Sequence, residues 1–297
     1  MKINKYIIAI IFVSIFIILL VNPFVWLKKS EKKKEEKTSP ISFNFGSGKE
    51  DLAISSDENL RPGSYEYKSV ILEKGTIGVE DSGRGQGKLI LVAQEKIVIK
   101  KEAKINLSGV GFKGAPSENK GEGAGKNFDF AGGGGSHKGS GGLGDCSKKD
   151  TSKTYGSSNG DESFGSGGGV GIKNNNGRGG NGGGFIKLIA PEIIIEGEVL
   201  SNGGNGQGSG GGGAGGKIVI LGNKVNLRGK ILANGGDGGT SQIQGAGGGG
   251  GGIIIFNVKP EGNGIFKVSG GKGGSALDIY TGCNGSDGEN GQIYTLN

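Results

Sequence analysis

The two cysteines, Cys146 and Cys283, are the side chains with the most specific chemistry in this 297-residue chain. Each lies in a polar, glycine-containing segment, GDCSKK for the first and TGCNGS for the second. In an exported chain two such cysteines favour a disulfide. Closing this loop would stabilise the fold by about 4–5 kcal/mol on the chain-entropy argument. Free thiols and an intermolecular bridge are the alternatives.

Glycine motifs that bind nucleotides in other proteins are matched only in part. Gly208, Gly210 and Gly213 fit G-x-G-x-x-G, but that motif must follow a strand and open a helix, whereas a strand-like segment follows here. The run that ends at Lys217 begins like a phosphate-binding loop, yet Ile218 stands where Ser or Thr would bind Mg²⁺. We therefore predict no cofactor.

Metal-binding and catalytic patterns are equally incomplete. His137, the only histidine, lies in GGGGSHKGSGG, where we expect a solvated loop residue without a zinc site or a Ser–His pair. A calcium nonapeptide needs an Asp at a fixed step, but GGNGQGSGG has Ser209 near that point and GGDGGTSQI has Asp237 at the wrong step. We predict no catalytic residue, no metal ligand and no enzymatic activity.

A repeat would position whatever chemistry the chain carries. Residues 184–206, GFIKLIAPEIIIEGEVLSNGGNG, align without a gap on residues 216–238, GKIVILGNKVNLRGKILANGGDG, at an offset of 32. A looser copy covers 252–271, and another begins at Lys88. A fixed period of this length is typical of repeat architectures.

Apolar residues alternate with polar ones inside each repeat, as in half-buried strands of three to six residues. Ile218, Ile220, Val225, Leu227 and Ile231 would point inward, and Lys217, Lys224, Asn226, Arg228 and Lys230 would point outward. Gly222 and Gly229 would turn the corners with positive φ. The pattern predicts an all-β fold, a right-handed parallel β-helix or β-solenoid with long glycine-rich loops.

Glycine, at 69 residues, is about three times as frequent as in ordinary proteins, and most of it lies between the repeats. Excursions at 203–216, 235–252 and 109–184 would leave after the third strand of a coil, either as mobile loops or as extended three-residue-per-turn helices packed together. Cys146 and Cys283 would lie about 14 Å apart along the stack, so a bridge requires the long insert to reach across coils.

The N-terminal region carries most of the net charge of +7. Residues 1–37 hold 8 Lys and 3 Glu, whereas the rest holds 27 basic and 25 acidic side chains, which argues against nucleic-acid binding. Residues 6–27, YIIAIIFVSIFIILLVNPFVWL, are long enough to span a bilayer. No A-x-A-like site follows, which favours an uncleaved transmembrane signal anchor over a cleaved signal peptide.

The predicted organisation follows from these segments: a tail at 1–5, the span at 6–27, a charged linker at 28–45, first solenoid coils at 46–110, a glycine-rich insert at 111–183, and further repeats with glycine-rich loops at 184–297. Lysines after the span favour a cytoplasmic domain by the positive-inside rule. The composition, which is typical of secreted solenoids, favours the outside, and we expect an extracytoplasmic C-terminal domain.

The segments FNFGSGKEDLAISS at 43–56 and YEYKSVILEKGTIGV at 65–79, with the two aligned repeats, resemble glycine-rich exported β-solenoid surface proteins of bacteria and archaea. The composition is also similar to glycine-rich adhesins of phage tail fibres, from which the membrane span departs. The resemblance implies an exported β-solenoid with a structural or adhesive role rather than a reaction. The partners that we expect are the membrane and surface polysaccharide or other cell-surface proteins. The alternative is a β-helix protein that binds or degrades polysaccharide, although the scattered aromatic residues argue against it.

Overall fold

A computed structural model describes residues 44–81, 83–118, 121–144, 151–173, 177–278 and 282–296. Thirteen strands form one sheet, every strand pair is parallel, and none of the described residues is helical. The prediction of an all-β, parallel, solenoid-like fold is therefore confirmed. The predicted span at 6–27 and nearly all of the linker at 28–45 lie outside the described residues.

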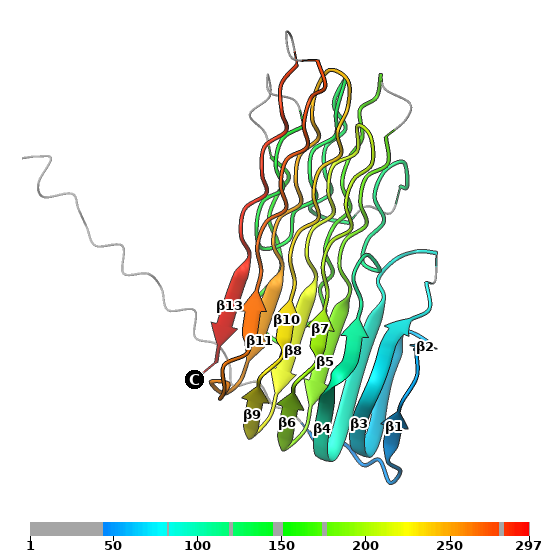
Figure 1. Cartoon of the computed structure of the whole chain (residues 1–297), viewed down its shortest axis with the longest axis vertical. Helices are drawn as coiled ribbons and strands as arrows, with labels where there is room; N and C mark the ends of the chain where they lie inside the picture. The colour runs from blue at the N-terminus through cyan, green and yellow to red at the C-terminus, as the bar shows by residue number, and fades with distance from the viewer. Residues whose placement is uncertain are drawn as a thin grey trace, which may run out of the picture. The chain divides into compact units, whose positions relative to one another are not determined.

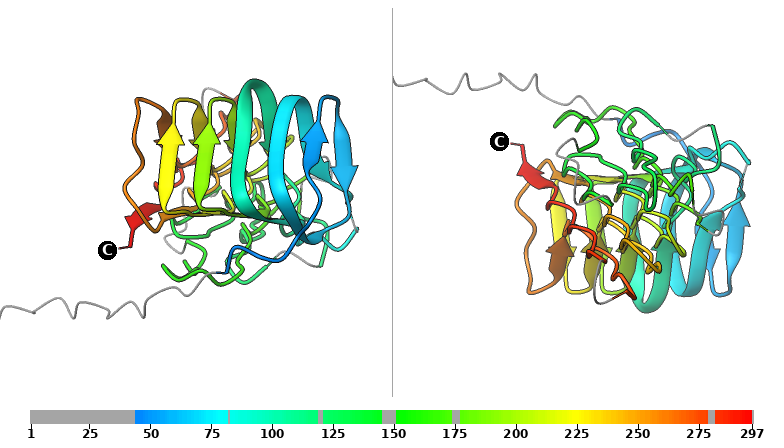
Figure 2. Two further views of the ribbon diagram at one scale, coloured as in Figure 1. Left: turned by 90° about the horizontal axis from the view of Figure 1, so that it is seen from below. Right: turned by 90° about the horizontal axis from the view of Figure 1, so that it is seen from above.

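The strands build six successive coils, which follow one another in chain order (Figures 1 and 2). Coil 1 contains β1 (Leu52–Ile54) and β2 (Glu58–Leu60), coil 2 is β3 (Gly63–Val79), and coil 3 is β4 (Lys88–Asn106). Coil 4 contains β5 (Phe185–Ile189), β6 (Glu192–Ile195) and β7 (Glu198–Leu200), and coil 5 contains β8 (Lys217–Leu221), β9 (Lys224–Leu227) and β10 (Lys230–Leu232). Coil 6 contains β11 (Ile253–Phe256) and β12 (Ile265–Lys267). Strand β13 (Gln292–Thr295) adds a seventh level on one face. Coils 1 and 2 precede the four repeats that the sequence alignment identified.

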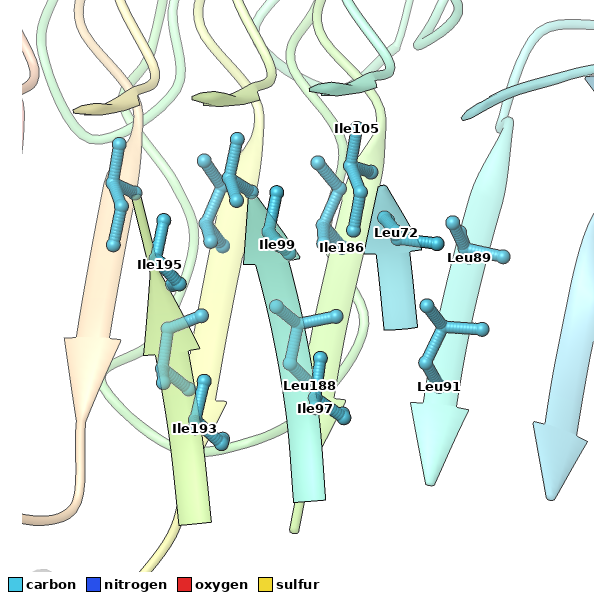
Figure 3. Packing of buried hydrophobic residues seen from close by; sticks show 14 of the residues in the cluster. Leu72, Leu89, Leu91, Ile97, Ile99, Ile105, Ile186, Leu188, Ile193 and Ile195 are labelled. Carbon is cyan, nitrogen blue, oxygen red and sulfur yellow. The ribbon is translucent and has the colours of Figure 1, made fainter. Parts of the chain in front are cut away.

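The register between coils 4 and 5 reproduces the 32-residue offset, and β11 follows β8 at an offset of 36 residues. Ile220 pairs with Leu188 on one side and Phe256 on the other, as the alternation predicts. The inward side chains form continuous apolar columns between the three faces of the stack (Figure 3). Burying each Leu or Ile stabilises the fold by about 1.5–3 kcal/mol, and a single coil has no neighbour with which to do so.

Two strands are longer than the predicted three to six residues. β3 has 17 residues and β4 has 19, because in these coils the chain stays paired around the corners. The register shifts between Tyr67 and Ser69 and between Leu72 and Lys74. Bulges of this kind bend a strand without breaking its ladder, so one strand serves all three faces.

The corner glycines act by close approach rather than by backbone conformation. Neither Gly222 nor Gly229 has a positive φ, so the predicted reason was wrong. A Cβ on Gly229 would lie 1.9 Å from the carbonyl oxygen of Gly197 in the coil below, and one on Gly222 would lie 2.9 Å from that of Ala190. The corners therefore stack more closely than a side chain permits.

One face of the stack, made by β5, β8 and β11, is buried on both sides. Its outward side chains form a second apolar cluster with Phe164 of the long insert: Val92, Phe185, Ile189, Val219, Leu221, Ile253 and Ile255. Lys217, predicted to be an outward polar residue, is fully buried on this face. The continuous apolar runs KIVIL and IIIF carry the signal for two-sided burial, whereas KVNL and KIL alternate.

Opposite charges align between coils 4 and 5 on the other two faces. The ion pairs, each 32 residues apart, are Glu192–Lys224 at 3.9 Å, Glu196–Arg228 at 3.6 Å and Glu198–Lys230 at 3.1 Å. Lys104 of coil 3 also contacts Glu198, at 3.0 Å, and these two lysines lower the pKa of Glu198. Exposed pairs contribute little individually, but a slip of one residue would turn each acid away from its base.

Candidate functional site

Four glycine-rich excursions, which we call arms 1 to 4, project from one end of the coil faces (Figure 1). Arm 1 is 109–184, arm 2 is 203–216, arm 3 is 235–252, and arm 4, which sequence analysis did not predict, is 269–291. Each leaves after the last strand of a coil and returns at the start of the next, as predicted for the first three. The strands of the coils therefore fix the base of every arm.

Hydrogen bonds within the arms repeat every third residue. The N–H groups of Gly210 and Gly213 bond to the carbonyls of residues 207 and 204 on the outgoing half of arm 2, and that of Gly216 bonds to the carbonyl of residue 201 just before the arm. Those of residues 211 and 214 reach arm 1, at residues 169 and 166, and those of 212 and 215 reach arm 3, at residues 247 and 250. A period of three with no ladder inside the segment is the geometry of an extended polyproline-II-type helix.

Glycine is required because the arm segments touch backbone to backbone. A Cβ on Gly211 would lie 2.1 Å from the carbonyl oxygen of Gly133, and one on Gly249 would lie 2.0 Å from that of Gly213. Of the two alternatives for the excursions, the packed helices are correct for the described residues. Because the buried N–H and C=O groups of these segments find partners in neighbouring arms, the bundle needs no apolar core.

The described turns at which the arms reverse lie in a row, at the end of the bundle away from the strands. We call them the tip row: residues 172–173, 177–178, 207–209, 240–244, 275–278 and 282–283. Arg178 exchanges backbone hydrogen bonds with Gln207, Gly239 donates to Gly210, and Leu277 donates to Ser241. Neighbouring turns are thus tied together along the row.

Exposed large apolar side chains occur at two places on the described residues. Three lie in the tip row: Ile172, 62% exposed, Leu277, 57% exposed, and Ile243. The others, Ile265, Phe266 and Ile293, lie at the end of the coil stack. Because an exposed aliphatic group on a turn contributes nothing to the core, the tip row is the candidate contact surface.

His137 is fully buried, so the expectation of a solvated loop residue was wrong. Arm 1 folds back over β8 and β11 and covers it. The Nδ1–H group donates to the Gly215 carbonyl at 2.8 Å, which leaves Nε2 to accept from the Ser163 hydroxyl at 2.9 Å. The ring packs on Tyr155, with 4.9 Å between centroids. Burial lowers the pKa of His137 to about 4.

This Ser–His pair differs from a catalytic one in its orienting group, which is a backbone carbonyl rather than a carboxylate. The imidazole has no exposed surface to offer a substrate. Residues 137 and 163 are both in arm 1 and residue 215 is in arm 2, so the contacts hold one arm against the other. Spacing alone could not identify the pair.

Lys217 lies close to His137 beneath the same part of arm 1. Its Nζ donates to the carbonyl oxygens of Ser157, at 3.1 Å, and Asp161, at 2.8 Å. Burial lowers the pKa of Lys217 to about 8, with Asp161 acting in the opposite direction. The buried ammonium thus ties the arm to β8 through two main-chain acceptors.

Of the predicted disulfide pair, Cys283 lies in the tip row and is not a free thiol. Cys146 lies outside the described residues, so the pairing stays a prediction. Among the described residues, no group of three or more His, Cys, Asp or Glu side chains is arranged to hold a metal ion. No helix within the described part of the chain has the length and apolar character needed to cross a membrane.

A shallow polar cleft of about 320 Å³ lies beside the tip row. Asn181 and Asn205 line it together with Arg178 and Gln207. The two asparagine side-chain oxygens already accept backbone N–H groups, from Gly114 at 2.9 Å and from Asp237 at 2.8 Å. Their NH₂ groups and the guanidinium of Arg178 therefore make this a cleft of donors.

Comparison with known proteins adds no relative: the chain matches no protein-family profile, no curated protein and no solved structure.

Proposed function

We propose that this protein is a structural or adhesive surface module without catalytic activity. In this proposal a single transmembrane helix at 6–27 anchors a right-handed parallel β-helix, whose arms are extracytoplasmic. The supporting observation is the tip row, where Ile172, Ile243 and Leu277 are exposed on turns of close-packed arms. A surface that is already ordered loses little conformational entropy when it binds.

The partners would be other cell-surface proteins that bury these aliphatic side chains. Cells displaying the full chain test this in an adhesion assay. The double substitution Ile172→Asp and Leu277→Asp should reduce adhesion at least about fivefold, because the loss of an interface anchor costs more than about 1 kcal/mol. Lys74→Asp, on coil 2, is the matched control and should leave adhesion unchanged. Equal adhesion of all three proteins would contradict a role for the tip row.

The proposed topology has its own test. Protease added to intact cells should degrade the domain that contains residues 44–296 while a cytoplasmic marker survives. A domain that resists protease until the membrane is opened would place it in the cytoplasm, which the lysines after the span favour by the positive-inside rule. A cytoplasmic location would exclude the surface role, whatever the tip row binds.

A polysaccharide-binding role is the second candidate, and the cleft of donors supports it. Hydroxyl and carboxylate oxygens of an acidic saccharide accept hydrogen bonds from guanidinium and amide groups. A glycan array probed with the full chain and with Arg178→Ala separates the candidates. Retention of acidic glycans that Arg178→Ala abolishes favours this second role, whereas no retention favours protein contacts.

A further inference from the structure

Eight Asn-Gly pairs lie within the described residues, and one of them differs from the rest in its surroundings. In such a pair the side-chain amide is readily lost, because glycine lets its backbone nitrogen reach the Cγ atom of the asparagine. In seven pairs that nitrogen is already engaged. Its N–H group donates to a main-chain carbonyl at 2.7–2.9 Å in Gly182, Gly203, Gly206, Gly235, Gly264, Gly285 and Gly291.

The asparagines of the arms are held by their side chains as well. The Oδ1 atoms of Asn202, Asn205 and Asn234 each accept a backbone N–H group of the next arm, at 2.8–2.9 Å. Both reacting groups of these pairs are therefore fixed by neighbouring arms. The reaction requires the arms to separate first, which is a local unfolding step.

The eighth pair, Asn159 and Gly160, lies in arm 1 and has a different environment. Asn159 is exposed, and within the described part of the chain the N–H group of Gly160 donates to no acceptor. The Oδ1 atom of Asn159 accepts the Ser157 hydroxyl and the N–H group of Asp161, the latter at 3.2 Å. Its Nδ2 group donates to the Asp161 carboxylate. Two donors on Oδ1 make Cγ more electrophilic and stabilise negative charge that develops on this oxygen.

We propose that Asn159 is a site of spontaneous covalent modification, at which the side-chain amide is lost and isoaspartate or aspartate forms. The Gly160 nitrogen bonds to Cγ of Asn159, the Cγ–Nδ2 bond breaks, and the proton of the Gly160 nitrogen leaves with Nδ2 as ammonia. Water then opens the resulting succinimide at either carbonyl, which gives isoaspartate or aspartate. The reaction needs no other reactant, and the proposal is independent of the proposed function.

The modification changes the contact between arm 1 and β8. The Nζ group of Lys217 binds the carbonyl oxygens of Ser157 and Asp161, which lie on either side of Asn159 in the chain. Isoaspartate lengthens the backbone between these two acceptors by a carbon atom, so both can no longer meet the ammonium as they do now. Aspartate keeps the backbone unchanged. Isoaspartate, but not aspartate, should therefore expose Lys217, which is fully buried in the unmodified chain.

Peptide mass spectrometry of the full chain, incubated in mild detergent at neutral pH, tests the proposal. In the folded chain Asn159 should lose its amide at least about tenfold faster than Asn202 and Asn234, because the arms must open before their pairs react. In urea the three should react at similar rates. Equal rates in the folded chain, or a slower reaction of Asn159 in the folded chain than in urea, would overturn the proposal.

A substitution tests the local assistance. Ser157→Ala should slow the loss of the Asn159 amide several-fold in the folded chain and leave the rate in urea unchanged, because the hydroxyl contacts Oδ1 only in the fold. Ser158→Ala is the matched control and should leave both rates unchanged. A folded Ser157→Ala chain that reacts as fast as the unaltered chain would refute the role of the hydroxyl.

Labelling with acetic anhydride tests the effect on arm 1. Lys217 should be acetylated several-fold faster in the aged fraction that carries isoaspartate than in the fresh chain, whereas Asn159→Asp should label as slowly as the fresh chain. Lys224, which is exposed on β9, gives the reference rate in each sample. Equally slow labelling of Lys217 in all three samples would show that the modification leaves the contact with β8 intact and would overturn this effect.

Discussion

The backbone N–H of Gly213 donates to the carbonyl of Gly204 at 2.8 Å, yet only one of these two glycines has room for a side chain. A Cβ on Gly213 would lie 2.0 Å from the carbonyl oxygen of Asn181, whereas the nearest atom to a Cβ on Gly204 would be 3.4 Å away. Neither has a positive φ, so alanine suits the local backbone at both positions.

Gly213→Ala should therefore lower the free energy of unfolding by about 1–3 kcal/mol or more, the usual cost of overpacking. Gly204→Ala should be neutral or stabilise by up to about 1 kcal/mol, because alanine restricts the unfolded chain. Urea midpoints of the two variants provide the comparison. Equal midpoints would show that the arms do not pack as described.

The columns predict a second contrast, between Ile220 and Lys224. Ile220→Asp places an unpaired charge between Leu188 and Phe256 and should destabilise by several kcal/mol. Lys224→Asp loses only an exposed ion pair with Glu192 and should cost less than about 1 kcal/mol. Chemical denaturation that ranked the two substitutions equally would refute the register of coil 5.

His137 predicts a specific loss of stability in weak acid. The folded pKa of about 4 lies below the ordinary 6.5, so as pH falls below 6.5 the unfolded chain takes up a proton that the folded chain excludes. Between pH 7 and pH 5 this should remove about 2 kcal/mol. Lys217 acts in a different pH range, because its pKa is lowered to about 8. Below pH 8 the buried ammonium is charged and destabilises the fold, and this destabilisation is relieved as pH rises from 8 toward 10.5.

The test compares how much the free energy of unfolding changes with pH in each protein, rather than its value at one pH. His137→Gln loses two hydrogen bonds and should be less stable at pH 7, but its further loss on going to pH 5 should be smaller than that of the unaltered chain by about 2 kcal/mol. If both proteins lost the same amount between these pH values, His137 would not be held neutral.

The predicted disulfide has a direct chemical test. We expect mass spectrometry of the exported, unreduced chain to find no alkylatable thiol and one peptide pair linking Cys146 to Cys283. A monomer that takes up two alkylating groups would exclude the bond, and a linked dimer would show that the bridge is intermolecular.

Sequence periodicity was sufficient to predict the coils because each inward residue stacks on the equivalent residue of the next coil. The 32-residue offset and the looser copy at 252–271 together correctly predict that Ile220 lies between Leu188 and Phe256, since parallel coils keep register only when equivalent residues stack. The order of the arms could not be predicted in this way. Glycine tracts that form mobile linkers have the same composition as tracts that pack, and the difference lies in hydrogen bonds between arms that are far apart in sequence.

The same limit explains the buried polar residues. His137 and Lys217 appear in polar contexts, GGSHKG and GGKIVI, and nothing local indicates that arm 1 covers β8. Burial comes from Phe164 and its neighbours folding back onto the outward side of β5, β8 and β11. The continuous apolar runs in those strands are the local signal for covering on both sides, and the alternating pattern by itself predicts only their inward half.

Hydrogen exchange of arm 2 tests the central claim, that the arms form an ordered bundle that holds the tip row in place. The amides of Gly212 and Gly215 donate to Gly247 and Gly250 and are buried. In the full chain we expect the peptide that covers 209–216 to exchange as slowly as the peptide of β8, over hours or longer. Exchange of 209–216 within seconds, while β8 stays protected, would show that the arms are mobile and would contradict this account.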